Sequence, residues 1–158
     1  INSITGRNML LWDGACHVHE KFSVEKILEL KKQYPDAKVL VHPECKGTVV
    51  KLADKVGSTA ALLKYSISDS SDTFIVATES GILHEMQKAC PENTFIPAPP
   101  SDSTCACNEC SYMKLVTMQK LYDCLKNEAP EIHVDSEVAE KAIVSINRML
   151  EISEKLGL

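Results

Sequence analysis

Two short motifs in the first third of the chain combine side chains that bind metals or move protons. Cys16 and His19 are separated by two residues, and His42 and Glu44 are separated only by Pro43. A thiolate with an imidazole is a common pair of metal ligands, and an imidazole beside a carboxylate can transfer protons to and from a substrate. Both pairs also have a structural interpretation, because cysteine is often an inert core residue and a glutamate in a first helical turn complements the helix dipole.

Three cysteines form the sharpest local pattern, because Cys105, Cys107 and Cys110 fall within six residues. This density indicates metal or redox chemistry. Structural zinc usually takes four ligands in two pairs, and a second pair is absent from the sequence. Iron–sulfur clusters, in contrast, use thiolates that can lie far apart in a chain. Cys107 with Cys110, or Cys105 with Cys107, could also form a redox pair.

A pair of hydroxyl residues, Ser58 and Thr59, follows Gly57 and precedes an apolar run with helical spacing. Hydroxyls and free amide groups at the start of a helix can bind an anion. The same pattern is typical of an ordinary helix cap, which is the commoner explanation.

The elements that must position these residues alternate between short apolar runs and segments of helical period. We predict strands at 9–12, 38–41, 73–77 and 94–96, with helices between them, and two longer helices near 115–125 and from about 135 onward. Such alternation predicts an α/β fold, a three-layer α/β/α domain with a mostly parallel four-stranded sheet. A polar segment follows each predicted strand: the Cys16–His19 motif, the His42–Glu44 motif, Thr78–Gly81 and the cysteine cluster. We therefore expect these segments to meet at the carboxyl edge of the sheet, where open α/β sheets bind ligands.

The composition narrows the classes of partner. The formal net charge is −5 with both signs interspersed, which argues against nucleic acid or an anionic membrane as a partner. No apolar run approaches the roughly 18 residues of a membrane span. Seven cysteines lead us to expect a reducing, cytoplasmic location. Because the chain begins at Ile1, we also expect it to be a piece of a longer protein.

The order and spacing of five motifs resemble those of quinolinate synthases, iron–sulfur enzymes that make the pyridine ring of NAD. Each motif is short, but their joint order is specific, and the resemblance extends from about Leu11 to Met113. The motifs are Cys16-x-x-His19, His42-Pro43-Glu44-Cys45, Gly57-Ser58-Thr59, Ala77-Thr78-Glu79-x-Gly81 and Cys107-x-x-Cys110-x-Tyr112-Met113. Ser111 departs from the family pattern, in which proline often follows the last cluster cysteine.

The resemblance implies an intact enzyme of three similar α/β/α domains around one 4Fe-4S cluster, with one cysteine ligand from each domain. Residues 1–16 then correspond to the end of the second domain, 17–110 to the third, and 111–158 to terminal helices that pack back on the absent first domain. Cys16 and Cys110 correspond to two of the cluster ligands, and the third lies upstream of this chain. We therefore expect the chain alone to be folded but inactive and to lack an intact cluster.

The resemblance also implies a reaction, the condensation of iminoaspartate with dihydroxyacetone phosphate to quinolinate. His19, His42 and Glu44 correspond to catalytic and substrate-binding residues, with Glu44 the group that moves protons. Ser58 and Thr59 correspond to a hydroxyl pair that holds an anionic group of the substrate. An enzyme that oxidises aspartate to iminoaspartate is the implied functional partner.

Two other functions stay open. A zinc-binding module could use Cys105, Cys107, Cys110 and one histidine. A thiol–disulfide oxidoreductase could use Cys107 and Cys110, although that motif normally opens a helix after the first strand of its domain. Neither alternative gives a role to His42 and Glu44.

Overall fold

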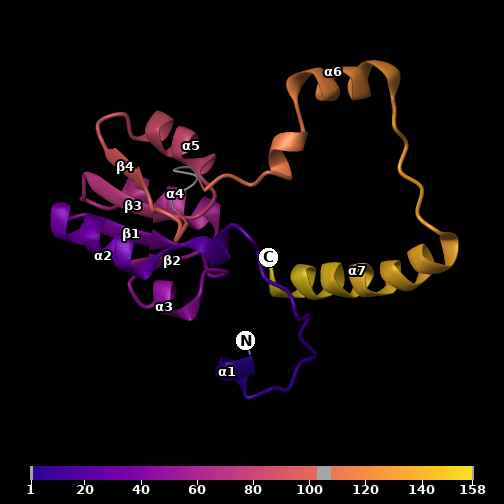
Figure 1. Ribbon diagram of the computed structural model, residues 1–158. Helices are drawn as coiled ribbons and strands as arrows, with labels where there is room; N and C mark the ends of the chain where they lie inside the picture. Colours follow the sequence, from indigo (N-terminus) through magenta and orange to yellow (C-terminus); the bar gives the residue numbers. More distant parts are fainter. Residues whose placement is uncertain (1, 103–107, 158) are drawn as a thin grey trace. The chain divides into compact units, whose positions relative to one another are not determined.

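The computed structural model describes residues 2–102 and 108–157. The chain forms two compact units, Ile1–Lys114 and Leu115–Leu158, and each is described by itself. The first unit holds the sheet and all of the motifs that carry candidate chemistry. The second unit consists of helices (Figure 1).

A four-stranded sheet forms the centre of the first unit, and its strands run in the order β2-β1-β3-β4 (Figure 1). All three pairings are parallel, which confirms the predicted α/β fold class. Val41, the last residue of β1, lies opposite Val56 at the end of β2 and Ala77 at the end of β3. Three strands therefore end at the same level, and the segments that follow them emerge side by side. The strands are β1 (Lys38–Val41), β2 (Lys55–Val56), β3 (Thr73–Ala77) and β4 (Thr94–Pro97).

Helices cover both faces of the sheet, as a three-layer domain requires. Val39 and Val41 of β1 pack into one core cluster together with Ile27 of α2, whereas Leu40 packs into a second cluster with Leu62 of α4. This alternation along β1 is the period of two that sends successive side chains to opposite faces. The helices of the first unit are α1 (Asn2–Thr5), the short 3₁₀ helix η1 (His19–Lys21), α2 (Val24–Gln33), α3 (Gly47–Val50), α4 (Thr59–Ser68) and α5 (Ile82–Ala89).

The predicted strand at 9–12 is wrong, because this segment has no regular structure. Leu10 is 101% exposed and Trp12 is 92% exposed, so neither side chain packs on the described residues. A run of four apolar residues carries no period of its own, and tertiary contacts decide whether it becomes a strand. The motif that contains Cys16 therefore does not follow a strand in this structure.

Strand β2 was not predicted, because its residues fall within a segment of helical spacing. Val49 and Val56 share this spacing, which predicted one helix between the strands, but α3 ends at Val50. The chain then turns, and the Asp54 carboxylate accepts a hydrogen bond from the Val39 amide at 2.8 Å, which leads Lys55 into register beside Leu40. A strand of two residues is too short to produce a detectable pattern.

The second unit contains the two predicted closing helices, α6 (Met118–Asn127) and α7 (Ser136–Leu156). The short 3₁₀ helix η2 (Met113–Leu115) spans the boundary between the units. Side-chain caps set both starts: Thr117 accepts from the Lys120 amide, and Asp135 accepts from the Val138 amide. No helix among the described residues has both the length and the apolar character needed to cross a lipid bilayer.

Candidate functional site

The carboxyl edge of the sheet carries an open pocket of about 640 Å³. Its lining includes one side chain from each segment that follows β1, β2 and β3, namely Glu44, Thr59 and Glu79. A second open pocket, of about 580 Å³, lies beside Cys16 and is also lined by Glu44. Glu44 therefore stands between the two pockets.

The segment that carries His19 reaches this edge through contacts with the chain after β4. The Ser23 amide donates to the Pro99 carbonyl at 3.1 Å, and Phe22 forms an isolated antiparallel bridge with Pro100. These contacts hold η1 at the strand ends although no strand precedes it. His19 is consequently buried next to His42, from which it is separated by more than twenty residues of sequence.

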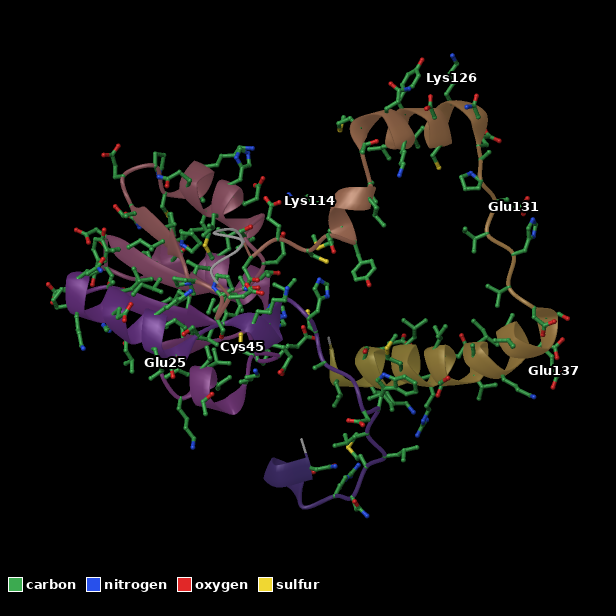
Figure 2. All side chains as sticks on the ribbon, viewed as in Figure 1. Glu25, Cys45, Lys114, Lys126, Glu131 and Glu137 are labelled. Carbon is green, nitrogen blue, oxygen red and sulfur yellow. The ribbon has the colours of Figure 1, made fainter. Side chains whose placement is uncertain are left out.

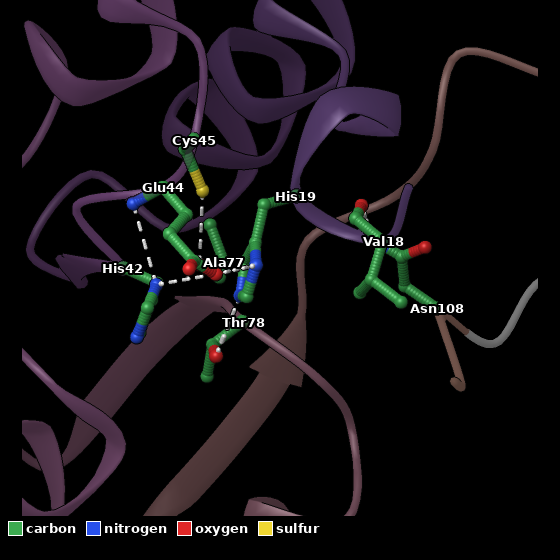
Figure 3. A network of polar contacts seen from close by, with 8 residues as sticks. All are labelled: Val18, His19, His42, Glu44, Cys45, Ala77, Thr78 and Asn108. Carbon is green, nitrogen blue, oxygen red and sulfur yellow. Dashed lines mark hydrogen bonds and ion pairs between the residues drawn. The ribbon is translucent and has the colours of Figure 1, made fainter. Parts of the chain in front are cut away.

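The two imidazoles stack on each other beside the Glu44 carboxylate. Their ring centroids lie 4.3 Å apart at an interplanar angle of 15°. Glu44 Oε2 is 3.1 Å from Nδ1 of His19 and 3.6 Å from Nδ1 of His42 (Figure 3). One carboxylate oxygen thus approaches both rings at once, from a side chain that is 58% exposed and open to a ligand.

Hydrogen bonds assign the proton positions on the His42 ring. Its Nδ1 accepts from the Glu44 backbone amide at 3.3 Å, so in the neutral ring the proton is on Nε2. Nε2 points away from the Glu44 carboxylate (Figure 3). His42 therefore offers an N–H donor, while Glu44 keeps its carboxylate lone pairs available.

His19 is held by a different partner and is kept neutral. Its Nε2 lies 3.1 Å from Thr78 Oγ1, and Thr78 is itself buried. Burial lowers the pKa of His19, and the neighbouring His42 lowers it further, against the opposing charges of Glu44 and Glu79. Since the ordinary value is 6.5, the ring is uncharged at neutral pH.

The two candidate cluster thiols, Cys16 and Cys110, are both half-buried and free of disulfides. Ligand atoms of Cys16, His19 and Glu44 all lie within 4.8 Å of one another. Cys110 is tied to the end of β3, because its amide donates to Glu79 Oε1 at 3.3 Å. Cys105 and Cys107, the other members of the possible redox pairs, lie outside the described residues.

The hydroxyl pair divides between two positions after β2. Ser58 is the N-cap of α4, and its Oγ accepts from the Ala61 amide at 3.3 Å. Thr59 lines the larger pocket with His19 and Glu44. The ordinary cap is therefore present, and Thr59, at the first helical position, lines the site beside it.

Comparison with known proteins identifies the family. A family model described as quinolinate synthetase A protein matches residues 1–151. The chain is 53% identical over 153 residues to the quinolinate synthase of Microcystis aeruginosa, which covers 97% of this chain and 48% of that protein. It is 53% identical to the quinolinate synthase of a Synechococcus strain and 54% identical to that of Thermosynechococcus vestitus, in each case over 149 residues. Each of these two matches covers 94% of this chain and 47% of the relative.

The chain belongs to the quinolinate synthase family. It spans about half the length of the quinolinate synthases that it matches.

Three polar residues of this family member support the site without having been among the candidate site residues, although Thr78 and Glu79 stood in one of the sequence motifs. Thr78 fixes His19, and Glu79 holds the Cys110 loop and the Gly81 amide, the latter at 2.8 Å. Buried Asn108 donates from Nδ2 to the Val18 carbonyl at 3.1 Å, which joins the loop before Cys110 to the segment after Cys16. Thr78 and Glu79 could have been found from their place after a strand. Nothing in the sequence marks Asn108.

The thiol of Cys45 provides a direct test of the packing beneath the site. Cys45, labelled in Figure 2, is 6% exposed, and its Sγ donates to the Ala77 carbonyl at 3.4 Å. Burial raises its pKa to about 12. We expect iodoacetamide at pH 8 to alkylate exposed Cys124 in the native, reduced chain and to leave Cys45 unmodified, because only about one Cys45 thiol in ten thousand is then ionised.

Peptide mass spectrometry measures both sites in the same sample. Denaturant is expected to make Cys45 as reactive as Cys124, because unfolding removes the burial that raises its pKa. Equal modification of the two thiols in the native chain would contradict this packing of Cys45.

Proposed function

We propose that this chain is part of a quinolinate synthase that condenses iminoaspartate with dihydroxyacetone phosphate and releases phosphate and two waters. The observation that carries the proposal is the stacked His19–His42 pair with Glu44 between its two pockets, in a chain more than 50% identical to named quinolinate synthases. Imidazole and carboxylate groups at one sheet edge suit a reaction that needs several proton transfers.

The donor set fits two of the three ligands of a 4Fe-4S cluster. Cys16 and Cys110 are unpaired, half-buried thiols at the edge that also carries Glu44 and Glu79. Thiolates from distant parts of a sequence commonly share one cluster, and the third ligand would come from outside this chain. When bound, the cluster would supply a Lewis-acidic iron without a cysteine ligand that can bind substrate oxygen or nitrogen.

The remaining roles follow from the hydrogen bonds of the site. Glu44 would accept and return protons, since its exposed carboxylate has free lone pairs. His42 would donate its Nε2 proton to a substrate oxygen, because its Nδ1 is occupied by the Glu44 amide. His19, neutral and fixed by Thr78, would position the substrate without adding charge.

Ser58 and Thr59 would bind the anionic group of the substrate at the start of α4. The Ser58 oxygen accepts from the Ala61 amide, which leaves its O–H free to donate. The start of a ten-residue helix adds partial positive charge and unpaired amides. An enzyme that oxidises aspartate would supply iminoaspartate, and we place the reaction in the cytoplasm.

Metal analysis of the complete protein, purified anaerobically, tests this function against the alternatives. Iron and acid-labile sulfide, together with quinolinate formation from the two substrates, are expected. Zinc in place of iron, with no quinolinate, would favour the module built on Cys105, Cys107 and Cys110.

The 158-residue chain by itself is expected to form no quinolinate and to assemble no intact cluster. It supplies only two of the proposed cluster ligands, and both pockets of the site are open. Tight binding of a small substrate needs a site that encloses most of its surface. Quinolinate formation by this chain under anaerobic conditions, assayed beside the complete protein, would contradict the proposed division of the site.

A further inference from the structure

Three side chains at the carboxyl edge form a compact set of metal donors within this chain. The thiol of Cys16, the imidazole of His19 and the carboxylate of Glu44 place their ligand atoms within 4.8 Å of one another. Sulfur, nitrogen and oxygen donors together suit divalent ions of borderline softness, above all Zn²⁺. These three residues are called the Cys16–His19–Glu44 triad below.

Nδ1 of His19 is a buried polar atom that points into the triad without a hydrogen-bond partner among the described residues. The His19 side chain is only 8% exposed. Glu44 Oε2 lies 3.1 Å from Nδ1, at ion-pair distance, and a metal ion bound between the two atoms would take the place of that contact. A buried nitrogen left in this way costs free energy unless another group binds it.

The contact between His19 and Thr78 is compatible with the tautomer that a metal needs. When Nε2 of His19 carries the proton and donates to Thr78 Oγ1, at 3.1 Å, Nδ1 presents its lone pair to the triad. Metal-binding histidines characteristically donate their other ring N–H to such a partner, which fixes the orientation of the ring.

The spacing of the His19 and Glu44 donors fits a tetrahedral ion, with the Cys16 thiol near enough to join them. Zinc–nitrogen and zinc–oxygen bonds of about 2.0–2.1 Å place two tetrahedral ligands about 3.3 Å apart. Nδ1 of His19 and Oε2 of Glu44 are already 3.1 Å apart. The pocket lined by Trp12, Gly14 and Ala15, beside Cys16 and Glu44, leaves room for water as a fourth ligand.

We propose that Cys16, His19 and Glu44 bind one divalent metal ion, Zn²⁺ in preference to Mg²⁺ or Ca²⁺, when no iron–sulfur cluster occupies Cys16. The site lies wholly within this chain and goes beyond the proposed function, since it concerns the cluster-free protein. Binding converts the Cys16 thiol to a thiolate and releases one proton to solvent. A bound zinc ion then blocks Cys16 as a cluster ligand.

Titration of the reduced, metal-free 158-residue chain with Co²⁺ tests the triad. Tetrahedral Co²⁺ with a thiolate ligand gives visible d–d bands and a sulfur-to-cobalt charge-transfer band in the near ultraviolet. One equivalent of Co²⁺ is expected to produce both, and Zn²⁺, but not Mg²⁺, should abolish them. Cys16→Ser is expected to remove the charge-transfer band, and Glu44→Gln to weaken binding.

Matched variants separate the triad from the other cysteines. The double variant Cys105→Ser/Cys107→Ser and the variant Cys124→Ser are expected to bind Co²⁺ as the parent chain does. Thr78→Val leaves all three ligands in place but removes the partner of His19 Nε2, so affinity should fall about 10–100-fold. Circular dichroism of each variant checks that the fold is retained.

A charge-transfer band that survives Cys16→Ser, or one that disappears in the Cys105→Ser/Cys107→Ser variant, would overturn the proposal. So would the absence of any Co²⁺ spectrum in the folded parent chain. These outcomes are independent of the proposed function, which is decided by the iron, sulfide and turnover of the complete protein.

Discussion

Replacing Glu44 by glutamine in the complete protein is expected to lower turnover about 10²–10⁴-fold, the usual contribution of a general acid–base group. Glutamine keeps nearly the same shape but cannot accept and return a proton. The His42 ring should keep its orientation, because it is the Glu44 backbone amide, not the carboxylate, that donates to His42 Nδ1. Iron and sulfide content should therefore stay unchanged while the initial rate of quinolinate formation falls.

Glu20→Gln is the matched control for this change. Glu20 lines the pocket beside Cys16, and its carboxylate pairs with Lys46 at 3.4 Å on a partly exposed surface. An exposed ion pair of this kind contributes little to stability, so turnover should stay near that of the parent protein. Near-normal turnover of Glu44→Gln would reduce Glu44 to a structural role. Equal losses of turnover in Glu44→Gln and Glu20→Gln would mean that turnover depends on the total negative charge at this edge and not on the Glu44 carboxylate in particular.

Strands with continuous apolar sequence could be predicted, and those that depend on a partner could not. β1 and β3 are apolar runs in the sequence because both faces of the sheet are covered, so every position after the first is buried. The run at 9–12 looks the same in sequence but is exposed in the structure. β2 has only two residues, and it forms because Leu40 of β1 is there to pair with it.

The meeting of His42 and Glu44 with the residues after β3 could be anticipated because parallel strands end together, as the register of Val41 with Ala77 shows. The route of His19 to the edge could not, because it depends on contacts with Pro99 and Pro100 far along the chain.

The hydrogen-bond partners of Thr78 and Glu79, and any role of Asn108, were also out of reach of the sequence. Each depends on the direction of one side chain toward a partner 31 to 90 residues away. Residue type and spacing identify which groups can do chemistry, but the hydrogen bonds that fix a tautomer or a loop appear only when the fold is known.

Replacing Cys110 by serine in the complete protein is expected to abolish the proposed 4Fe-4S cluster. Serine lacks the thiolate that iron requires, and a cluster that has only three protein ligands would lose one of them. The structure offers no other described thiol on this loop, since Cys110 is the one cysteine there that it describes. Iron and acid-labile sulfide in the anaerobically purified variant should both fall to background, and quinolinate formation should fall with them.

Cys105→Ser is the matched control, because it removes a thiol from the same loop without touching the proposed ligand. It is expected to keep the iron and sulfide of the parent protein, whereas any redox role of Cys105 with Cys107 would alter only its response to oxidants. Glu79→Gln adds a graded test, because it weakens the acceptor that holds the Cys110 amide at 3.3 Å but leaves every thiol in place. We expect Glu79→Gln to lose part of its iron, Cys110→Ser to lose all of it and Cys105→Ser to keep it.

Equal loss of iron in the two cysteine variants would mean that the wrong thiol was assigned or that both thiols hold the metal. That result would make the zinc-binding module a candidate again.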